Sequence, residues 1–306
     1  MAKKQLIFQD LAQIREFGNI EFLAKQLVEG FITGLHRSPF HGFSVEFAEH
    51  RLYNTGESTR HIDWKVFAKT DKLFVKRYEE ETNLRAVLLL DISSSMYYPV
   101  ENYGKLTFSI MAASAIAYML QKQKDAVGLV TFADSIIQQT AVKSTSSHTH
   151  KLFLTLDQLL HSQAQAQGTN IAPIIHEIAE KIHKRSLVII FSDMFDRAES
   201  QEELFSALNH LKYNQHEVLL FHVNDKKTEL DFDFKERPTE FVDLETGQKV
   251  QVQPGQIKDV YRSYVEQFYK ALKLKCGQYK IDFIEADIRS TFDQILYTYL
   301  VKRSKM

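Results

Sequence analysis

The fold is decided by Val87-Leu88-Leu89-Leu90-Asp91-Ile92-Ser93-Ser94-Ser95-Met96, an aliphatic run that ends in a carboxylate and three hydroxyls. Four consecutive aliphatic residues predict a strand that is buried on both faces, as in a parallel sheet. The polar residues then form a loop at the carboxyl end of the strand, where open α/β sheets bind ligands. Asp91, Ser93 and Ser95 offer only hard oxygen donors, which suit Mg²⁺, Mn²⁺ or Ca²⁺ better than zinc. The first hypothesis is therefore an oxygen-ligated divalent cation.

The composition is that of an ordinary globular protein. The chain has 306 residues, of which 44% are hydrophobic and 25% charged, and we expect one main domain with additions. The net charge of -1 favours neither nucleic acid nor an anionic membrane as a partner. The single cysteine, Cys276, excludes an internal disulfide and a cysteine-based metal site, which fits a reducing compartment. No secretory signal and no run of about 20 apolar residues are present, so we predict a cytoplasmic protein without a membrane span.

Strands and helices alternate after residue 85. This order predicts an α/β fold with a doubly wound, mostly parallel sheet and helices on both faces. The predicted strands are 87–90, 126–133, 136–142, 186–191, 217–223 and 281–286. The predicted helices are 105–123, 150–160, 171–182, 201–212, 257–278 and 291–302. Short alternating segments at about 226–255 interrupt the order and predict an inserted hairpin.

The first part of the chain has a different texture. Apolar residues recur at helical spacing over 8–29, which predicts a helix with a break near Gly18-Asn19. Glycine, serine and proline among aromatic residues over 30–83 predict short strands and turns. We therefore predict two parts, an N-terminal region over 1–84 and an α/β domain over 85–306.

Two further loops carry oxygen donors, one before a predicted helix and one after a predicted strand. Thr169 lies in the segment before the helix at 171, and Asp193 follows the strand 186–191. Right-handed crossovers would bring both loops to the same edge of the sheet as Asp91, Ser93 and Ser95. The alternative is that these five residues only cap the helices that follow them.

This set of loops resembles the metal-ion-dependent adhesion site of von Willebrand factor type A domains, in which Asp-x-Ser-x-Ser, a loop Thr and a later Asp hold Mg²⁺ or Mn²⁺. The resemblance implies that Ser93 and Ser95 ligate the cation directly and that Thr169 does so directly or through water. It also implies that Asp91 and Asp193 act mainly through waters, with Mg²⁺ or Mn²⁺ preferred over Ca²⁺. Hydroxyl ligands leave the cation electrophilic, so it would accept an acidic side chain of a partner protein.

Motifs before the sheet resemble the family named domain of unknown function 58, whose members join such a region to a type A domain. They include Arg37-Ser38-Pro39-Phe40-His41-Gly42, Arg60-x-Ile62-Asp63-Trp64-Lys65 and Leu73-x-Val75-Lys76. Ser58 departs from the pattern, which has an acidic residue there. Because genes of this family accompany those of MoxR-type AAA+ ATPases, the resemblance implies such an ATPase as partner and a chaperone-like role toward an unknown client protein.

Two interpretations of Arg60, Asp63, Trp64 and Lys65 stay open. These residues could form a surface that docks a partner or nucleotide. Alternatively, Trp64 packs the N-terminal region onto the sheet and Arg60 forms an ion pair with Asp63.

An enzyme is the main competing function. A metal-dependent phosphatase of the haloacid dehalogenase type also places an Asp after a buried strand, but it needs a second Asp where this chain has Ser93. The chain lacks a Gly-x-x-x-x-Gly-Lys-Ser/Thr phosphate loop, a Gly-x-Ser-x-Gly elbow and a His-Glu-x-x-His motif. A third possibility is a type A domain with an empty site. We favour a metal-dependent interaction adaptor over a phosphatase or other phosphoryl-transfer hydrolase.

Overall fold

The computed structural model describes most of the chain, and it divides into two units. One unit comprises 1–32 and 84–306, and the other comprises 33–83. In the smaller unit, β1 (His50–Leu52) pairs antiparallel with β2 (Phe74–Lys76). The residues that the structure describes are 14–15, 19–35, 50–52, 67–69, 71, 73–76, 84–162, 171–194 and 201–303.

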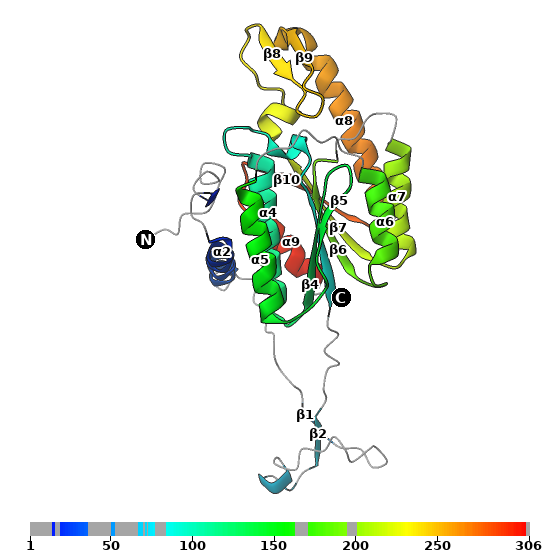
Figure 1. Cartoon of the computed structure of the whole chain (residues 1–306). Coiled ribbons are helices and arrows are strands. Elements are labelled where there is room, and N and C mark those ends of the chain that lie inside the picture. The colour runs from blue at the N-terminus through cyan, green and yellow to red at the C-terminus, as the bar shows by residue number, and fades with distance from the viewer. Residues whose placement is uncertain are drawn as a thin grey trace. The chain divides into compact units, whose positions relative to one another are not determined.

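A six-stranded sheet with the order β10-β7-β6-β3-β4-β5 forms the centre of the larger unit (Figure 1). Its strands are β3 (Arg85–Asp91), β4 (Ala126–Phe132), β5 (Ile136–Gln139), β6 (Leu187–Ser192), β7 (Glu217–Asn224) and β10 (Asp282–Asp287). All neighbouring pairs are parallel except β4 and β5, which are antiparallel. The predicted α/β fold class with a mostly parallel sheet is therefore confirmed.

Helices cover both faces of this sheet (Figure 1). One layer consists of α4 (Gly104–Lys122), α5 (Ser146–Leu160) and α9 (Asp293–Arg303). The opposite layer consists of α6 (Ile171–Lys181), α7 (Gln201–Tyr213) and α8 (Pro254–Gln278). In the described part of the chain, no helix combines the length and the apolar character that a bilayer crossing requires.

An additional helix, α2 (Ile20–Leu35), packs against the layer that contains α4. Ala24 and Val28 on its inner face are fully buried in the same cluster as the residues of α4. The Asn19 side chain begins the helix, because its Oδ1 accepts the backbone N–H of Phe22 at 2.9 Å. The segment 20–32 therefore folds with the sheet, although it lies within the first 84 residues.

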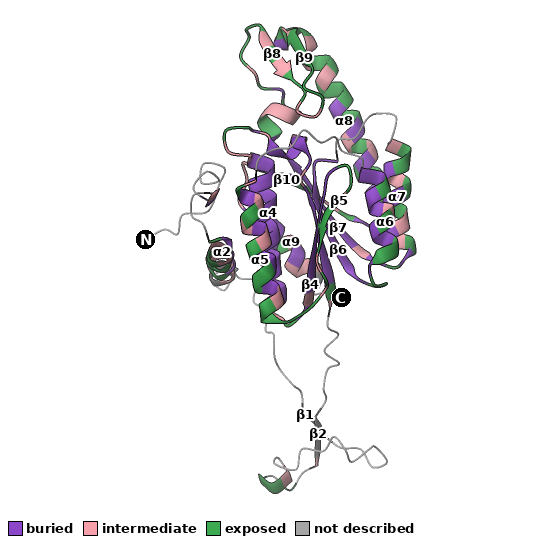
Figure 2. Ribbon diagram, in the orientation of Figure 1, coloured by how far each residue is buried: buried purple, intermediate pink, exposed green. Residues whose placement is uncertain are grey.

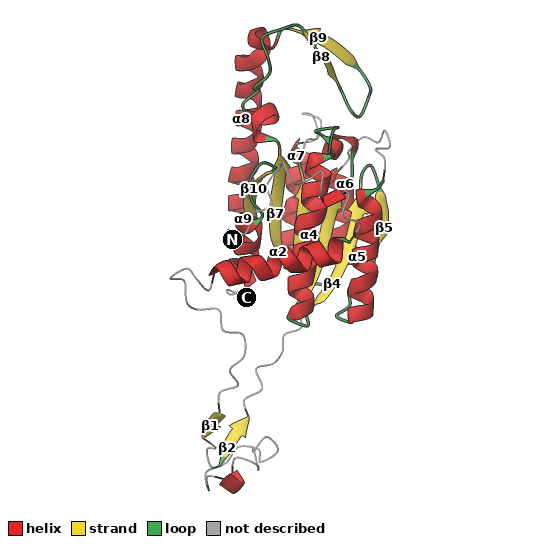
Figure 3. Ribbon diagram, turned by 90° about the vertical axis from the view of Figure 1, so that its left-hand side faces the viewer, coloured by secondary structure: helices red, strands yellow, loops and turns green. Residues whose placement is uncertain are grey.

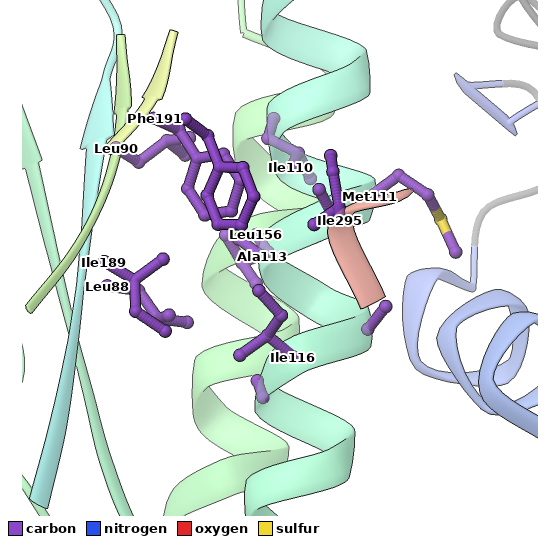
Figure 4. Packing of buried hydrophobic residues seen from close by; sticks show 14 of the residues in the cluster. Leu88, Leu90, Ile110, Met111, Ala113, Ile116, Leu156, Ile189, Phe191 and Ile295 are labelled. Atoms are coloured by element: carbon purple, nitrogen blue, oxygen red, sulfur yellow. The ribbon is translucent and has the colours of Figure 1, made fainter. Parts of the chain in front are cut away.

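The alternating side chains of β3 explain why its sequence is apolar throughout. Leu88 and Leu90 pack toward α4, whereas Val87 and Leu89 pack toward α6. Figure 4 shows Leu88, Leu90 and the β6 residues Ile189 and Phe191 opposite the side chains of α4. Burial is concentrated in the strands and the inner helix faces, while the outer faces of α5, α6 and α7 are exposed (Figure 2).

The segment between β7 and α8 forms a hairpin beyond the carboxyl end of the sheet (Figure 3). It begins with the short π-helix η5 (Lys226–Leu230) and continues into β8 (Thr239–Val242) and β9 (Lys249–Val252). The turn between these strands contains Gly247 at a φ of +72°, a conformation that glycine adopts without strain. Phe232 packs against Phe241 and Tyr261, with ring centroids 5.7 and 4.6 Å apart, and so joins the hairpin to α8.

Some element ends differ from the sequence prediction. α8 begins at Pro254 instead of 257, because proline is well tolerated in the first turn of a helix. β5 ends at Gln139 instead of 142, and the chain then forms only an isolated bridge between Lys143 and Val127.

Candidate metal centre

The candidate site lies where the strand order of the sheet reverses. From β3 the chain adds β4 and β5 on one side, and then β6, β7 and β10 on the other. In open α/β sheets the crevice at such a switch point is the usual ligand site. The parallel register pairs Leu90 with Phe191, so Asp91 and Ser192 are adjacent at the carboxyl ends of these two strands.

Asp91 is fully buried at this point, and both of its carboxylate oxygens accept hydrogen bonds. Oδ1 accepts the backbone N–H of Ser93 at 2.9 Å, and Oδ2 accepts the hydroxyl of Ser192 at 2.6 Å. Burial and the nearby negative charge of Asp193 outweigh these hydrogen bonds and raise the pKa of Asp91 to about 7. The charge of Asp91 would therefore be stabilised by a cation in the same place.

Ser93 and Ser95 direct their hydroxyls toward each other across the turn that follows β3. The 3₁₀ helix η3 (Ser94–Tyr97) begins after Ser93, but the Ser93 side chain makes no capping hydrogen bond to it. Instead, the two Oγ atoms lie 3.0 Å apart. That distance suits a hydrogen bond, and it also matches the spacing of about 2.9 Å expected between adjacent oxygens around an octahedral Mg²⁺.

Asp193 is fully buried after β6 and forms an ion pair with a buried lysine. Lys105 Nζ donates to Asp193 Oδ2 at 2.8 Å and to Glu229 Oε1 at 2.5 Å. Burial alone would lower the pKa of Lys105, but the charges of Asp193 and Glu229 outweigh burial and raise it. Lys105 therefore stays protonated. The next residue, Met194, has a φ of 51°, an uncommon conformation for a non-glycine residue.

The donor set of this site fits a hard divalent cation. When ionised, Asp91, Asp193 and Glu229 carry three negative charges against the one positive charge of Lys105. The hydroxyls of Ser93 and Ser95 could supply neutral oxygen ligands in the same site. These donors are all oxygens, whereas zinc sites are usually built from cysteine and histidine, so the set suits Mg²⁺ or Mn²⁺ better than zinc.

The structure brings together four of the five predicted site residues, and the fifth falls outside its description. Asp91, Ser93 and Ser95 are linked by hydrogen bonds through one turn, and Asp193 is close enough to affect the pKa of Asp91. Thr169 lies in the segment 163–170, outside the described residues. The predicted docking residues are likewise outside the described residues, namely Arg60, Asp63, Trp64 and Lys65.

Comparison with known proteins gives the family. The sequence pattern of the family described as "Protein of unknown function DUF58" matches residues 49–271, which is more than half of the chain. The chain belongs to the DUF58 family. The uncharacterized protein Rv1480 of Mycobacterium tuberculosis (strain H37Rv) is 24% identical over 174 residues, which are 57% of this chain and 55% of that protein. The match thus spans about half the length of this mycobacterial relative.

Solved structures with similar folds are more distant. BatB from Bacteroides thetaiotaomicron is 14% identical, and the match covers 73% of this chain and 100% of that chain with a TM-score of 0.42. A von Willebrand factor type A protein from Catenulispora acidiphila is 14% identical, with 47% of this chain and 34% of that chain covered and a TM-score of 0.34. Similarity at this level assigns no residue role to this DUF58 protein.

Three residues of the site were missed by sequence reasoning. Ser192 directly follows the predicted strand 186–191, but its hydrogen bond to Asp91 depends on the register between β3 and β6. Lys105 carries a signal in the sequence, since it is a charge at the start of a helix that is apolar on nearly every side. Glu229 carries no such signal, because it lies in an inserted segment whose position relative to the sheet does not follow from the sequence pattern.

Asp225 fixes the chain between β7 and η5 in this DUF58 protein. Its carboxylate is fully buried and accepts two hydrogen bonds from Arg289, at 2.6 and 2.7 Å. Replacing Arg289→Ala leaves the buried carboxylate without its cation, so we expect a loss of about 2–3 kcal/mol in the free energy of unfolding.

Urea denaturation followed by circular dichroism measures this effect. Arg289→Lys is the matched control, because it keeps the charge but not the paired geometry, and it should lose less. A loss below about 0.5 kcal/mol for Arg289→Ala would contradict the structural role of the pair.

Proposed function

We propose that this protein is a metal-dependent protein-interaction adaptor. In this proposal, Ser93, Ser95 and Thr169 hold Mg²⁺ or Mn²⁺ together with Asp91 and Asp193, and an acidic side chain of a partner completes the site. When bound, the cation supplies a positive charge that a carboxylate can ligate. In this proposal the five residues form a recognition site without catalytic activity, in line with the DUF58 family and the α/β fold.

The pair of serine hydroxyls next to two buried carboxylates is the observation that carries this proposal. If the serines only capped helices, Ser93 Oγ would accept a backbone N–H of η3, and it does not. The hydroxyls are 3.0 Å apart, and the pKa of Asp91 is raised by burial and by Asp193. A divalent cation would relieve the repulsion between the two carboxylates.

The exposure of the site indicates how a partner would approach. Asp91, Ser93 and Asp193 are buried, whereas Ser95 is partly exposed, so among the described ligands Ser95 alone reaches the surface. A carboxylate from a partner would enter from the side of Ser95. The carboxylates of Asp91 and Asp193 would lie on the buried side of the cation and hold its position.

The family resemblance supports a more specific partner. By that resemblance, the acidic side chain belongs to a MoxR-type AAA+ ATPase, and the pair acts in a chaperone-like role on a client protein. A phosphatase is less well supported, because both oxygens of Asp91 accept hydrogen bonds and its side chain is fully buried.

Removal of the metal tests the adaptor proposal. The cognate ATPase should be retained on the immobilised protein when the free MgCl₂ concentration is well above the Kd, so that the site stays loaded. It should elute when EDTA is added. A phosphatase assay with Mg²⁺ and with Mn²⁺ provides the opposing test. Retention unchanged by EDTA, or turnover that Asp91→Ala abolishes, would overturn the proposal.

A further inference from the structure

Lys105 is the one buried charged residue of α4, whose other buried residues are apolar or carry only a hydroxyl. Its side chain is 1% exposed, and it contacts Asp193 from the β6 loop and Glu229 from η5. Burying an ammonium is costly unless carboxylates compensate it. Lys105 therefore depends on these two partners, one of which belongs to the candidate metal centre.

Glu229 divides its carboxylate between Lys105 and the backbone of η5. Oε1 accepts from Lys105 at 2.5 Å, and Oε2 accepts the N–H of Asp225 at 2.7 Å. The Asp225 N–H is at the start of η5, which leads into the β8–β9 hairpin. A continuous chain of contacts thus runs from Asp193 through Lys105 and Glu229 to the base of the hairpin.

We propose that Lys105 is a positioning residue that couples the metal centre to the base of the hairpin. When the cation binds, it drives the Lys105 ammonium away from Asp193 and toward Glu229. This inference rests on the proposed metal-dependent function. Lys105 and a divalent cation are both attracted to Asp193, and they repel each other. Cation binding therefore weakens the contact between Lys105 and Asp193 and strengthens that between Lys105 and Glu229.

Coupling of this kind acts in both directions. If the cation strengthens the contact between Lys105 and Glu229, then that contact must raise the affinity for the cation by the same factor. In Glu229→Gln the ammonium keeps one carboxylate partner among the described residues, Asp193, and competes with the cation for it. We expect the affinity for Mn²⁺ to fall by about fivefold or more, the range typical of coupled sites.

A purely Coulombic explanation makes a different prediction from this one. Glu229→Gln also removes a negative charge near the site, which would lower cation affinity whether or not Lys105 is present. The test is therefore a double-mutant cycle in the full chain with Lys105→Met, Glu229→Gln and the double variant, using Mn²⁺ alone as the probe. The double variant loses one charge of each sign and so keeps the net charge of the protein. Because it buries no unpaired charge from this pair, it can still be measured if one of the single variants does not fold.

Calorimetric titration should show that Glu229→Gln lowers Mn²⁺ affinity by about fivefold or more in the presence of Lys105 and clearly less in the Lys105→Met background. Hydrogen exchange should show that Mn²⁺ protects the amides of 226–252 in the unmodified protein and not in Lys105→Met. Equal effects of Glu229→Gln in both backgrounds would overturn the inference while leaving the adaptor proposal intact. Absence of Mn²⁺ binding to the unmodified protein would overturn both.

Discussion

The Ser93→Ala, Ser95→Ala double variant is expected to lose at least about 100-fold in affinity for Mn²⁺ and to release the cognate ATPase. Removing a residue that only hydrogen-bonds to a metal ligand already lowers metal affinity by about 10–100-fold. This variant removes two residues that are proposed to ligate the metal directly. The two Oγ atoms are 3.0 Å apart, so the variant removes both members of this hydroxyl pair. The fold should persist, because the Ser93 side chain makes no capping hydrogen bond.

Calorimetric titration with Mn²⁺, thermal unfolding and a pull-down of the ATPase measure these three outcomes. Ser94→Ala is the matched control, since Ser94 lies between the two serines in the same turn but is not in the predicted ligand set. Its affinity for Mn²⁺ should be that of the unmodified protein. If the double variant bound Mn²⁺ as tightly as Ser94→Ala does, the serines would not be ligands and the proposed site would be wrong.

The strand at the centre of the fold was predictable because its sequence carries the information locally. An aliphatic run such as Val87 to Leu90 must be covered on both faces, and a central strand between two helix layers meets that requirement. The order of elements then predicted the mostly parallel sheet. The same reasoning brought Asp91 and Asp193 to one edge, because carboxyl ends of parallel strands share an edge.

Contacts that depend on register or on an insertion were beyond the sequence. The hydrogen bond from Ser192 to Asp91 requires that Leu90 pair with Phe191, and several other alignments would satisfy the same apolar pattern. Glu229 reaches Lys105 because a five-residue π-helix follows β7, and the sequence there predicted only a hairpin. Lys105 could have been noticed, since a lysine facing a core calls for a carboxylate partner.

Replacing Phe191→Ala is expected to lower the free energy of unfolding by about 3–5 kcal/mol, the usual cost of removing a buried phenylalanine side chain. Phe191 is fully buried and stacks on Phe221 of β7 with ring centroids 5.0 Å apart. It also points toward α4 and Leu156 of α5, which cover the same face of the sheet (Figure 4). Because interiors are close-packed, these neighbours can fill the cavity only in part.

Guanidinium denaturation at equilibrium measures this loss. Phe191→Leu keeps most of the apolar volume and should cost less than about half as much. Phe22→Ala removes the same side chain from α2, where Phe22 is 44% exposed, and should change the stability by no more than about 0.5 kcal/mol. A loss below about 1 kcal/mol for Phe191→Ala would mean that β6 is not a central strand. Ser192 and Asp193 would then lack a core strand to hold them beside Asp91, because Ser192 ends β6 and Asp193 follows it.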